Sequence, residues 1–185
     1  ATHHGDGTQA IFYHRDDVFF ASTHTDPSSY YPHDFGYADE EGAGAGRGCN
    51  LNLPLPPGSG DDAYADAVRR LADAVKAFGA QALVISAGWD AHRDDPLSRL
   101  AVTTSAYEVL GGLLAQLALP SVIVQEGGYQ ASVIGDPLKR FLQGLRSGIS
   151  GCLSPARRPR PRSRQAPRRL DQWGPRRHRW LEPWP

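Results

Sequence analysis

Two short apolar runs with a helical segment between them constrain the fold of this chain more than any other feature. The runs occupy residues 81–86 and 121–125, and both contain β-branched side chains. Runs of this length and composition are typical of strands that are covered on both faces of a sheet. Between them, a capping box at Ser105 and Glu108 predicts a helix that runs to about Ala118. Parallel strands joined through a helix predict an α/β protein.

The flanking segments extend this alternation. From Asp61 onward, apolar side chains recur at helical spacing until Gly79, and Asp61 or Asp62 is expected to cap this helix. The predicted fold is a three-layer open parallel sheet with helices on both faces, incomplete at its N-terminus. The remaining predicted elements are a strand over residues 17–23, at most one short strand over 51–55 and a last helix over about 137–145.

Composition excludes several other classes of protein. No apolar run approaches the roughly 20 residues that span a bilayer, and no secretory signal segment is present. Cys49 and Cys152 stand far apart and outside any metal or disulfide motif. We therefore expect a cytoplasmic protein that does not bind membranes. The sequence has no methionine and opens inside a polar run, so Ala1 is not expected to be a native start.

Charge divides the chain into two regions. Residues 151–185 hold ten of the 20 Lys and Arg residues and only two acids, so this end carries +8 and the remainder −8. Arginine, proline and tryptophan dominate this end without helix or strand periodicity. We predict a folded unit over residues 1–147 and a tail over 148–185 that is disordered or non-native. Clustered arginine with tryptophan would also suit an RNA or membrane-surface arm, which is the less favoured alternative.

Polar turns follow three of the predicted strands. They read STHTD from Ser22, SAGWDAH from Ser86 and QEGGY from Gln125. Ligands of open parallel sheets bind outside the carboxyl ends of the strands, so these turns should meet at one edge. Taken singly, each His, Asp or Tyr in them is more often structural than functional. Their joint placement after successive strands favours a functional site, because turn formation alone does not require these residue types together.

Three segments resemble signatures of the histone deacetylase and acetylpolyamine amidohydrolase family, which has an arginase-like fold. They read HHGDGTQ from His3, GWDAH from Gly88 and EGGY from Glu126, in this order. The segment that follows Ser22, including PHDFGY from Pro32, is more similar to acetylpolyamine amidohydrolases and their bacterial relatives than to nuclear histone deacetylases. The resemblance covers about residues 1–147 and corresponds to the C-terminal part of the family's domain.

The resemblance implies a catalytic Zn²⁺ ion bound by His3 and Asp90. An imidazole nitrogen and a carboxylate oxygen bind zinc at about 2.0–2.2 Å, and three protein ligands leave a position for water and substrate. The family's third ligand is an Asp two residues before His3, where this chain has Ala1. With two ligands, zinc should bind more weakly than in a complete site.

The resemblance also implies roles for other residues. Tyr129 would donate a hydrogen bond to the developing oxyanion, and Asp6 would orient a general-base histidine from a segment before residue 1. Tyr31 would line a tunnel for the alkyl chain of the substrate, and Gly128 would lie in the substrate-binding turn. A structural monovalent-cation site, for which K⁺ is the suggested ion, would use Ser22 and the carbonyls of Thr23 and His3.

The expected function is zinc-dependent deacetylation of acetylated amines, such as acetylpolyamines or acetyl-lysine side chains. We expect impaired turnover in this chain, because a zinc ligand and the general-base histidines are missing from it. The alternative is a non-catalytic, truncated deacetylase remnant or a partner-binding module. A parallel sheet that lacks strands would expose apolar surface, so a homo-oligomer or another partner is also expected.

Overall fold

The computed structural model describes residues 1–152, with side chains through residue 148. None of the helices in this part of the chain is long and apolar enough to cross a membrane. Most of the predicted tail lies outside the described residues, so the boundary after residue 147 stays a prediction. The elements are, in order, α1 (Asp6–Phe12), β1 (Phe20–Thr25), the 3₁₀ turn η1 (Gly44–Gly46), β2 (Asn50–Leu55), α2 (Asp61–Phe78), β3 (Leu83–Ala87), α3 (Ala106–Ala115), β4 (Ser121–Gln125) and α4 (Ala131–Cys152).

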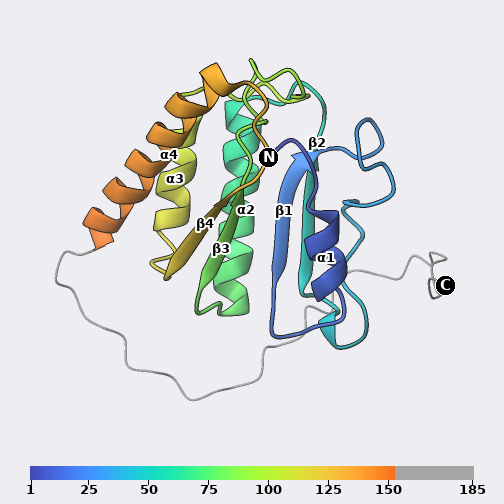
Figure 1. The fold of residues 1–185 in the computed structure, drawn as a ribbon. Helices are drawn as coiled ribbons and strands as arrows, with labels where there is room; N and C mark the ends of the chain where they lie inside the picture. The colour runs from blue at the N-terminus through green and yellow to red at the C-terminus, as the bar shows by residue number, and fades with distance from the viewer. Residues whose placement is uncertain (153–185) are drawn as a thin grey trace.

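The strands form two parallel pairs, which confirms the predicted α/β class. β1 pairs with β2, in a register that places Phe20 opposite Asn50, and β3 pairs with β4, with Leu83 opposite Ser121. Within residues 1–152, the two pairs are not hydrogen-bonded to each other. The first residues of the chain lie near the upper ends of the strands, between the two pairs (Figure 1).

Helices contact both faces of the β1–β2 pair. On one face, Gln9 of α1 accepts hydrogen bonds from the side chains of Asn50 and Asn52 at 3.0 and 2.8 Å. Successive residues of a strand point to opposite faces, so Leu55 belongs to the other face. Leu55 packs there against the hydrophobic core, which includes Tyr64 of α2. This part of the sheet therefore has the predicted three layers.

The β3–β4 pair is covered on one face only. Its inner face carries Ile85 and Ile123, which pack against the core. On its outer face, Val84, Val122 and Val124 are 69%, 60% and 42% exposed. The prediction that residues 81–86 form a strand covered on both faces is thus wrong for this chain, because no described element lies over these valines. We call these three residues the valine face.

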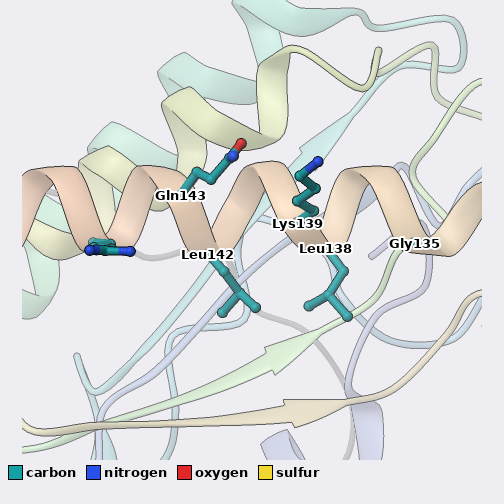
Figure 2. Close-up of a pocket in the computed structure, with 6 residues that line it drawn as sticks. Gly135, Leu138, Lys139, Leu142 and Gln143 are labelled. Carbon is teal, nitrogen blue, oxygen red and sulfur yellow. The ribbon is translucent and has the colours of Figure 1, made fainter.

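A groove along α4 adds apolar surface elsewhere on the molecule. Leu138 and Leu142 project from one side of the helix and line this groove together with Gly135 (Figure 2). Leu138 also packs against the core, whereas Leu142 is 46% exposed. The groove is therefore a surface depression above the core and not an enclosed cavity.

The core holds the turn that follows β3. Trp89 is 3% exposed, and its ring lies 5.7 Å from each of the rings of Tyr107 in α3 and Phe141 in α4, measured between centroids. Buried aromatic contacts of this kind contribute area burial and fix ring orientation. Since Trp89 directly precedes Asp90, this packing anchors the main chain from which the Asp90 side chain projects.

Helices begin and end differently from several predictions. The capping box at Ser105 is wrong, because Ser105 has helical dihedral angles and its hydroxyl instead pairs with that of Thr103 at 2.8 Å. Asp61 lies in the first turn of α2 and does not cap it, since its carboxylate accepts hydrogen bonds from the Thr103 amide and hydroxyl. The predicted end of α2 is confirmed, because Gly79 adopts φ 82°.

Two helices depart further from the prediction. α1 was not predicted, because it is short and contains Gly7 and Thr8, which have low helix propensity. The side chain of Gln9 in α1 is held by hydrogen bonds from Asn50 and Asn52, which are distant from it in the sequence. α4 begins at Ala131, ahead of the expected start at Pro137, which lies inside the helix. Proline is favoured in the first turn of a helix, and for this reason Pro137 predicts the start of this one. The helix in fact begins six residues earlier.

The close packing of α3 against α4 generates a stability prediction. A Cβ atom on Gly111 would overlap the carbonyl of Phe141, whereas one on Gly112 would stand 3.9 Å from the Gly144 carbonyl, an ordinary contact. We expect Gly111→Ala to lower the free energy of unfolding by about 2 kcal/mol, because the helices must separate. Gly112→Ala, the control, should be neutral or stabilising. Urea unfolding followed by circular dichroism would measure both, and equal effects of the two variants would contradict the packing.

Candidate metal and substrate site

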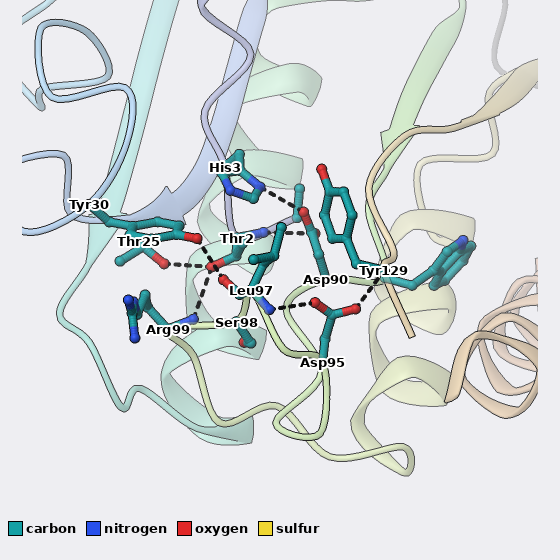
Figure 3. A network of polar contacts seen from close by, with 12 residues as sticks. Thr2, His3, Thr25, Tyr30, Asp90, Asp95, Leu97, Ser98, Arg99 and Tyr129 are labelled. Atoms are coloured by element: carbon teal, nitrogen blue, oxygen red, sulfur yellow. Dashed lines mark hydrogen bonds and ion pairs between the residues drawn. The ribbon is translucent and has the colours of Figure 1, made fainter. Parts of the chain in front are cut away.

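The turns after β1, β3 and β4 meet around the first residues of the chain, as Figure 3 shows. The Thr2 amide donates to Asp90 Oδ1 at 2.9 Å, and the Thr2 carbonyl accepts from the Thr25 amide at 2.9 Å. The Trp89 amide donates to the Gly127 carbonyl at 2.9 Å. These bonds bring the three predicted turns to one edge of the strands.

His3 and Asp90 form the polar centre of this site. His3 Nδ1 lies 2.8 Å from Asp90 Oδ2, and the two residues are 87 positions apart in the sequence. The His3 side chain is 22% exposed, whereas that of Asp90 is 1% exposed. The His3 imidazole is therefore accessible from solvent, whereas the Asp90 carboxylate is buried beside it.

The Asp90 carboxyl is held in its ionised form. Burial by itself would raise the pKa of Asp90, but the hydrogen bonds from His3 and from the Thr2 amide act in the opposite direction, and the pKa is lowered overall. A Cβ atom on Gly127 would collide with this carboxylate, which explains the glycine at that position. A buried, ionised carboxylate is a suitable ligand for a metal cation.

Three tyrosines lie around the His3 imidazole. The ring centroids of Tyr30, Tyr31 and Tyr129 lie 5.2, 6.2 and 6.1 Å from that of His3. Tyr31 and Tyr129 are 59% and 53% exposed, so their rings form a rim and not a closed tunnel in this chain. Burial, Asp90 and Asp95 raise the pKa of the Tyr129 phenol, which keeps it protonated and able to donate a hydrogen bond.

The turn that carries Tyr129 contains one position, Gly128, whose main-chain conformation favours glycine. Gly128 has φ 144°, and a Cβ atom there would approach the side chains of Ile134 and Trp89 at 3.1 to 3.4 Å. A residue with a side chain would be strained in this conformation. Gly128 thus lets the main chain turn from β4 towards the site, and its predicted contact with substrate stays a prediction.

Three other predicted site residues interact with groups outside the His3–Asp90 pair. Asp6 is the first residue of α1 and contributes to the electrostatic environment of His4. The Ser22 hydroxyl lies 2.9 Å from His24 Nδ1, and the Thr23 hydroxyl donates to the Leu53 carbonyl at 3.0 Å. The orienting role of Asp6 and the monovalent-cation site at Ser22 and Thr23 stay predictions.

His3 and Asp90 offer the kinds of atom that bind zinc, but they provide only two protein ligands. Imidazole nitrogen and carboxylate oxygen are both zinc ligands. Within residues 1–152, however, no three His, Cys, Asp or Glu side chains come together as a metal-binding group. Zinc remains the ion that His3 and Asp90 would suit, with fewer protein ligands than a complete site has.

Comparison with known proteins decides the family. The protein family described as the histone deacetylase domain matches residues 2–145. The chain belongs to the histone deacetylase family. The chain is 46% identical over 143 residues to the acetylpolyamine amidohydrolase of Burkholderia pseudomallei. The aligned residues are 77% of this chain and 42% of that relative. The chain is also 46% identical over 142 residues to acetylpolyamine amidohydrolase 1 of Pseudomonas aeruginosa, with 77% and 41% covered.

Solved structures confirm the deacetylase fold. The crystal structure of acetylpolyamine aminohydrolase from Burkholderia pseudomallei superposes with a TM-score of 0.77 at 45% identity, over 80% of this chain and 43% of that one. A histone deacetylase homologue complexed with SAHA gives a TM-score of 0.71 at 30% identity, over 81% and 40%. The chain thus spans about two fifths of the length of these relatives.

Several residues at the site were not among the predicted ones. Tyr30 lies nearest to His3 of the three tyrosines, and its hydroxyl donates to the Leu97 carbonyl at 2.9 Å. Arg99 stacks over the Tyr30 ring at 5.1 Å. The Asp95 carboxylate accepts a hydrogen bond from the Tyr129 amide at 2.7 Å. The sequence offers no signal that separates Tyr30 from Tyr31 or Asp95 from Asp94, because each pair is adjacent and chemically alike.

Two buried histidines lie next to the site in this deacetylase family member. The rings of His4 and His24 are 4.5 Å apart between centroids. The His24 Nε2–H donates to the Gly36 carbonyl at 2.9 Å, so its Nδ1 is left to accept from the Ser22 hydroxyl. Burial, together with His4, lowers the pKa of His24 to about 4, and burial lowers the pKa of His4. Both side chains are therefore neutral at pH 7.

The lowered pKa of His24 generates a prediction on pH. An unfolded histidine has a pKa of about 6.5, so the unfolded chain binds more protons as the pH falls from about 6.5 to 4. We expect the free energy of unfolding to fall by about 2 kcal/mol at pH 5 through His24. Urea unfolding at pH 7 and pH 5 would measure this. His24→Asn should weaken the pH dependence and the exposed control His14→Asn should not, so an unchanged dependence in His24→Asn would contradict the assignment.

Proposed function

We propose that this chain carries the metal-binding and oxyanion-stabilising part of a zinc-dependent deacetylase that acts on small acetylated amines. The observation that carries the proposal is the 2.8 Å contact between His3 Nδ1 and the buried Asp90 carboxylate, with Tyr129 beside it. Two relatives that are 46% identical to the chain over 143 and 142 residues are named acetylpolyamine amidohydrolases, which supports acetylated polyamines as the substrate class. Acetyl-lysine side chains are the second substrate class, through the histone deacetylase family.

The chain's own residues divide the chemistry between them. His3 and Asp90 would hold the ion, which when bound would supply Lewis-acid polarisation of the amide carbonyl and a water of lowered pKa. Tyr129 would donate a hydrogen bond from its protonated phenol to the oxygen on which negative charge develops. The rings of Tyr30 and Tyr31 would limit the approach to His3 to a slender alkyl chain. K⁺ at Ser22 and Thr23 and a cytoplasmic location remain parts of this proposal.

Turnover by the isolated chain is expected to be impaired. His3 and Asp90 provide two donors, and no pair of adjacent histidines other than His3 and His4 occurs in the 185 residues. His4 is buried at 5% exposure and its Nε2 lies 3.1 Å from Asn52 Oδ1, so it is not directed at the site as a base. Both zinc affinity and proton transfer should therefore be weak.

Zinc binding tests the donor assignment. Titration of the chain with Zn²⁺, followed by calorimetry, should give one weak site. His3→Ala and Asp90→Asn should each weaken it by roughly ten-fold or more, because one of two ligands is lost. His14→Ala, an exposed histidine elsewhere, is the matched control. Retention of the wild-type affinity in both ligand variants would disprove the assignment.

A third donor can be added to the same site. A Cβ atom on Gly88 would lie 2.5 Å from the Ala1 Cβ and 2.6 Å from Asp90 Oδ1, so a carboxylate at position 1 would enter the space beside Asp90. Without metal, Ala1→Asp should lower the melting temperature, because two carboxylates would repel each other. The variant should bind zinc roughly ten-fold more tightly than the unaltered chain does. If zinc stabilises Ala1→Asp no more than the unaltered chain, the site is not the one proposed.

Hydrolysis assays test the activity. The chain with excess zinc should convert acetylputrescine and an acetyl-lysine peptide at rates close to the rate without protein. If turnover is measurable, Tyr129→Phe should reduce it by about 100-fold, as expected for loss of an oxyanion donor. Rapid hydrolysis by the unaltered chain would contradict the impairment, and hydrolysis that survives Tyr129→Phe unchanged would contradict the role of the phenol.

A second candidate function rests on a different observation. The valine face is a surface of apolar side chains that normally would be covered in a three-layer sheet. A non-catalytic deacetylase domain that binds a partner, or a second copy of itself, through this face would also explain the exposure. Complete absence of zinc binding, together with a homo-oligomer or partner complex in solution, would favour this alternative.

A further inference from the structure

Asp95 has a buried carboxylate, and both of its oxygens accept hydrogen bonds from main-chain amides. It is 6% exposed. Its Oδ2 accepts from the amides of Tyr129 and Gln130 at 2.7 and 3.2 Å, and its Oδ1 accepts from the Leu97 amide at 3.0 Å. Hydrogen bonds to an ionised acceptor are stronger than those between neutral groups. This carboxylate therefore joins two turns that are 34 residues apart in the sequence.

The Tyr129 side chain has little packing of its own. It is 53% exposed, and the two residues before it are glycines, of which Gly128 adopts φ 144°. Two consecutive glycines give the main chain more conformational freedom than two residues with a Cβ atom would. The Tyr129 amide is fixed by its hydrogen bond to the Asp95 carboxylate (Figure 3). The place of the phenol thus depends on a residue from another turn.

The start of α4 strengthens this link. Tyr129 and Gln130 directly precede α4, and the Asp95 carboxylate lies at the end of the helix where the amides are directed outward. A negative charge at this end is favoured by the helix dipole. The same carboxylate also holds Leu97, whose carbonyl accepts from the Tyr30 hydroxyl. Asp95 thus connects the Tyr129 turn to Tyr30 through Leu97.

We propose that Asp95 is a positioning residue that holds the main chain of Tyr129 so that its phenol faces His3 and Asp90. The value of this position for catalysis rests on the proposed function, since Tyr129 would be the oxyanion donor. Asp95 itself does not touch the reacting atoms. It acts through the turn, and it sets how far the phenol lies from the metal ligands.

Hydrogen exchange in the unaltered chain provides the first test. In a ¹⁵N-labelled sample of the full 185-residue chain, the amides of Tyr129 and Gln130 should exchange more slowly than their intrinsic rates by roughly ten-fold or more. Exchange at the intrinsic rates would overturn the proposal. This test requires neither a variant, nor zinc, nor turnover.

The ring of Tyr129 provides a second test, on position. Its edge-on contact with His3, at 6.1 Å and 81°, should shift the proton signals of the imidazole, and Tyr129→Ala defines the signals without this ring. Asp95→Asn keeps the size of the side chain but places an amide group against amide donors. It should move the His3 signals towards the Tyr129→Ala values and should speed exchange at Tyr129.

Asp94→Asn is the matched control, because Asp94 is the neighbouring carboxylate and its side chain is 62% exposed. It should leave the His3 signals and the Tyr129 exchange rate unchanged. In the Tyr129→Ala background, Asp95→Asn should cause no further shift at His3, which separates a positioning role from a general loss of structure. The proposal is overturned if Asp95→Asn leaves the His3 signals as they are, or if both Asp variants shift them equally.

The outcome is separable from that of the proposed function. Loss of zinc binding or of hydrolysis would leave the exchange and ring-shift results standing as a statement about Tyr129 placement. Conversely, wild-type signals in Asp95→Asn would reject the positioning role even in a chain that binds zinc. Should Asp95→Asn fail to fold, the exchange rates of the unaltered chain decide alone.

Discussion

The buried carboxylate of Asp90 is the interaction on which the site depends. One of its oxygens accepts from the Thr2 amide and the other faces His3, so a single side chain fixes the first residues of the chain against the turn after β3. Taking a charge out of water is costly unless hydrogen bonds and opposite charge compensate it. Here Thr2 and His3 supply the hydrogen bonds that compensate the Asp90 charge. The same contacts that shape the site therefore also hold these two residues in place.

This dependence also explains how the two strand pairs are held together. β1 and β3 are not hydrogen-bonded to each other within the described chain, and Thr2 links their carboxyl ends through Thr25 and Asp90. The core below, built around Trp89, Tyr107 and Phe141, fixes the β3 side of this link. The polar edge and the apolar core therefore support each other through one pair of neighbouring residues, Trp89 and Asp90.

Sequence patterns predicted the elements whose stability is local or periodic. The apolar stripe that ends at Gly79 predicted α2, and the run at Ser121 predicted β4, because both signals lie within the segment itself. Features that depend on distant partners escaped prediction. Gln9 stabilises α1 through asparagines of β2, and Asp95 differs from Asp94 only in what the fold places next to it. The family resemblance supplied the pairing of His3 with Asp90, which spacing alone does not give.

The valine face has a consequence for how this chain behaves outside the site. Contacts between apolar surfaces depend on the release of ordered water, and their strength changes with temperature and with the salt present. An association through Val84, Val122 and Val124 would loosen in the cold and tighten in sulfate, which is the reverse of what attraction between surface charges would do on addition of salt. If such an association forms, its extent would therefore depend on the temperature and salt of the buffer before any substrate is added.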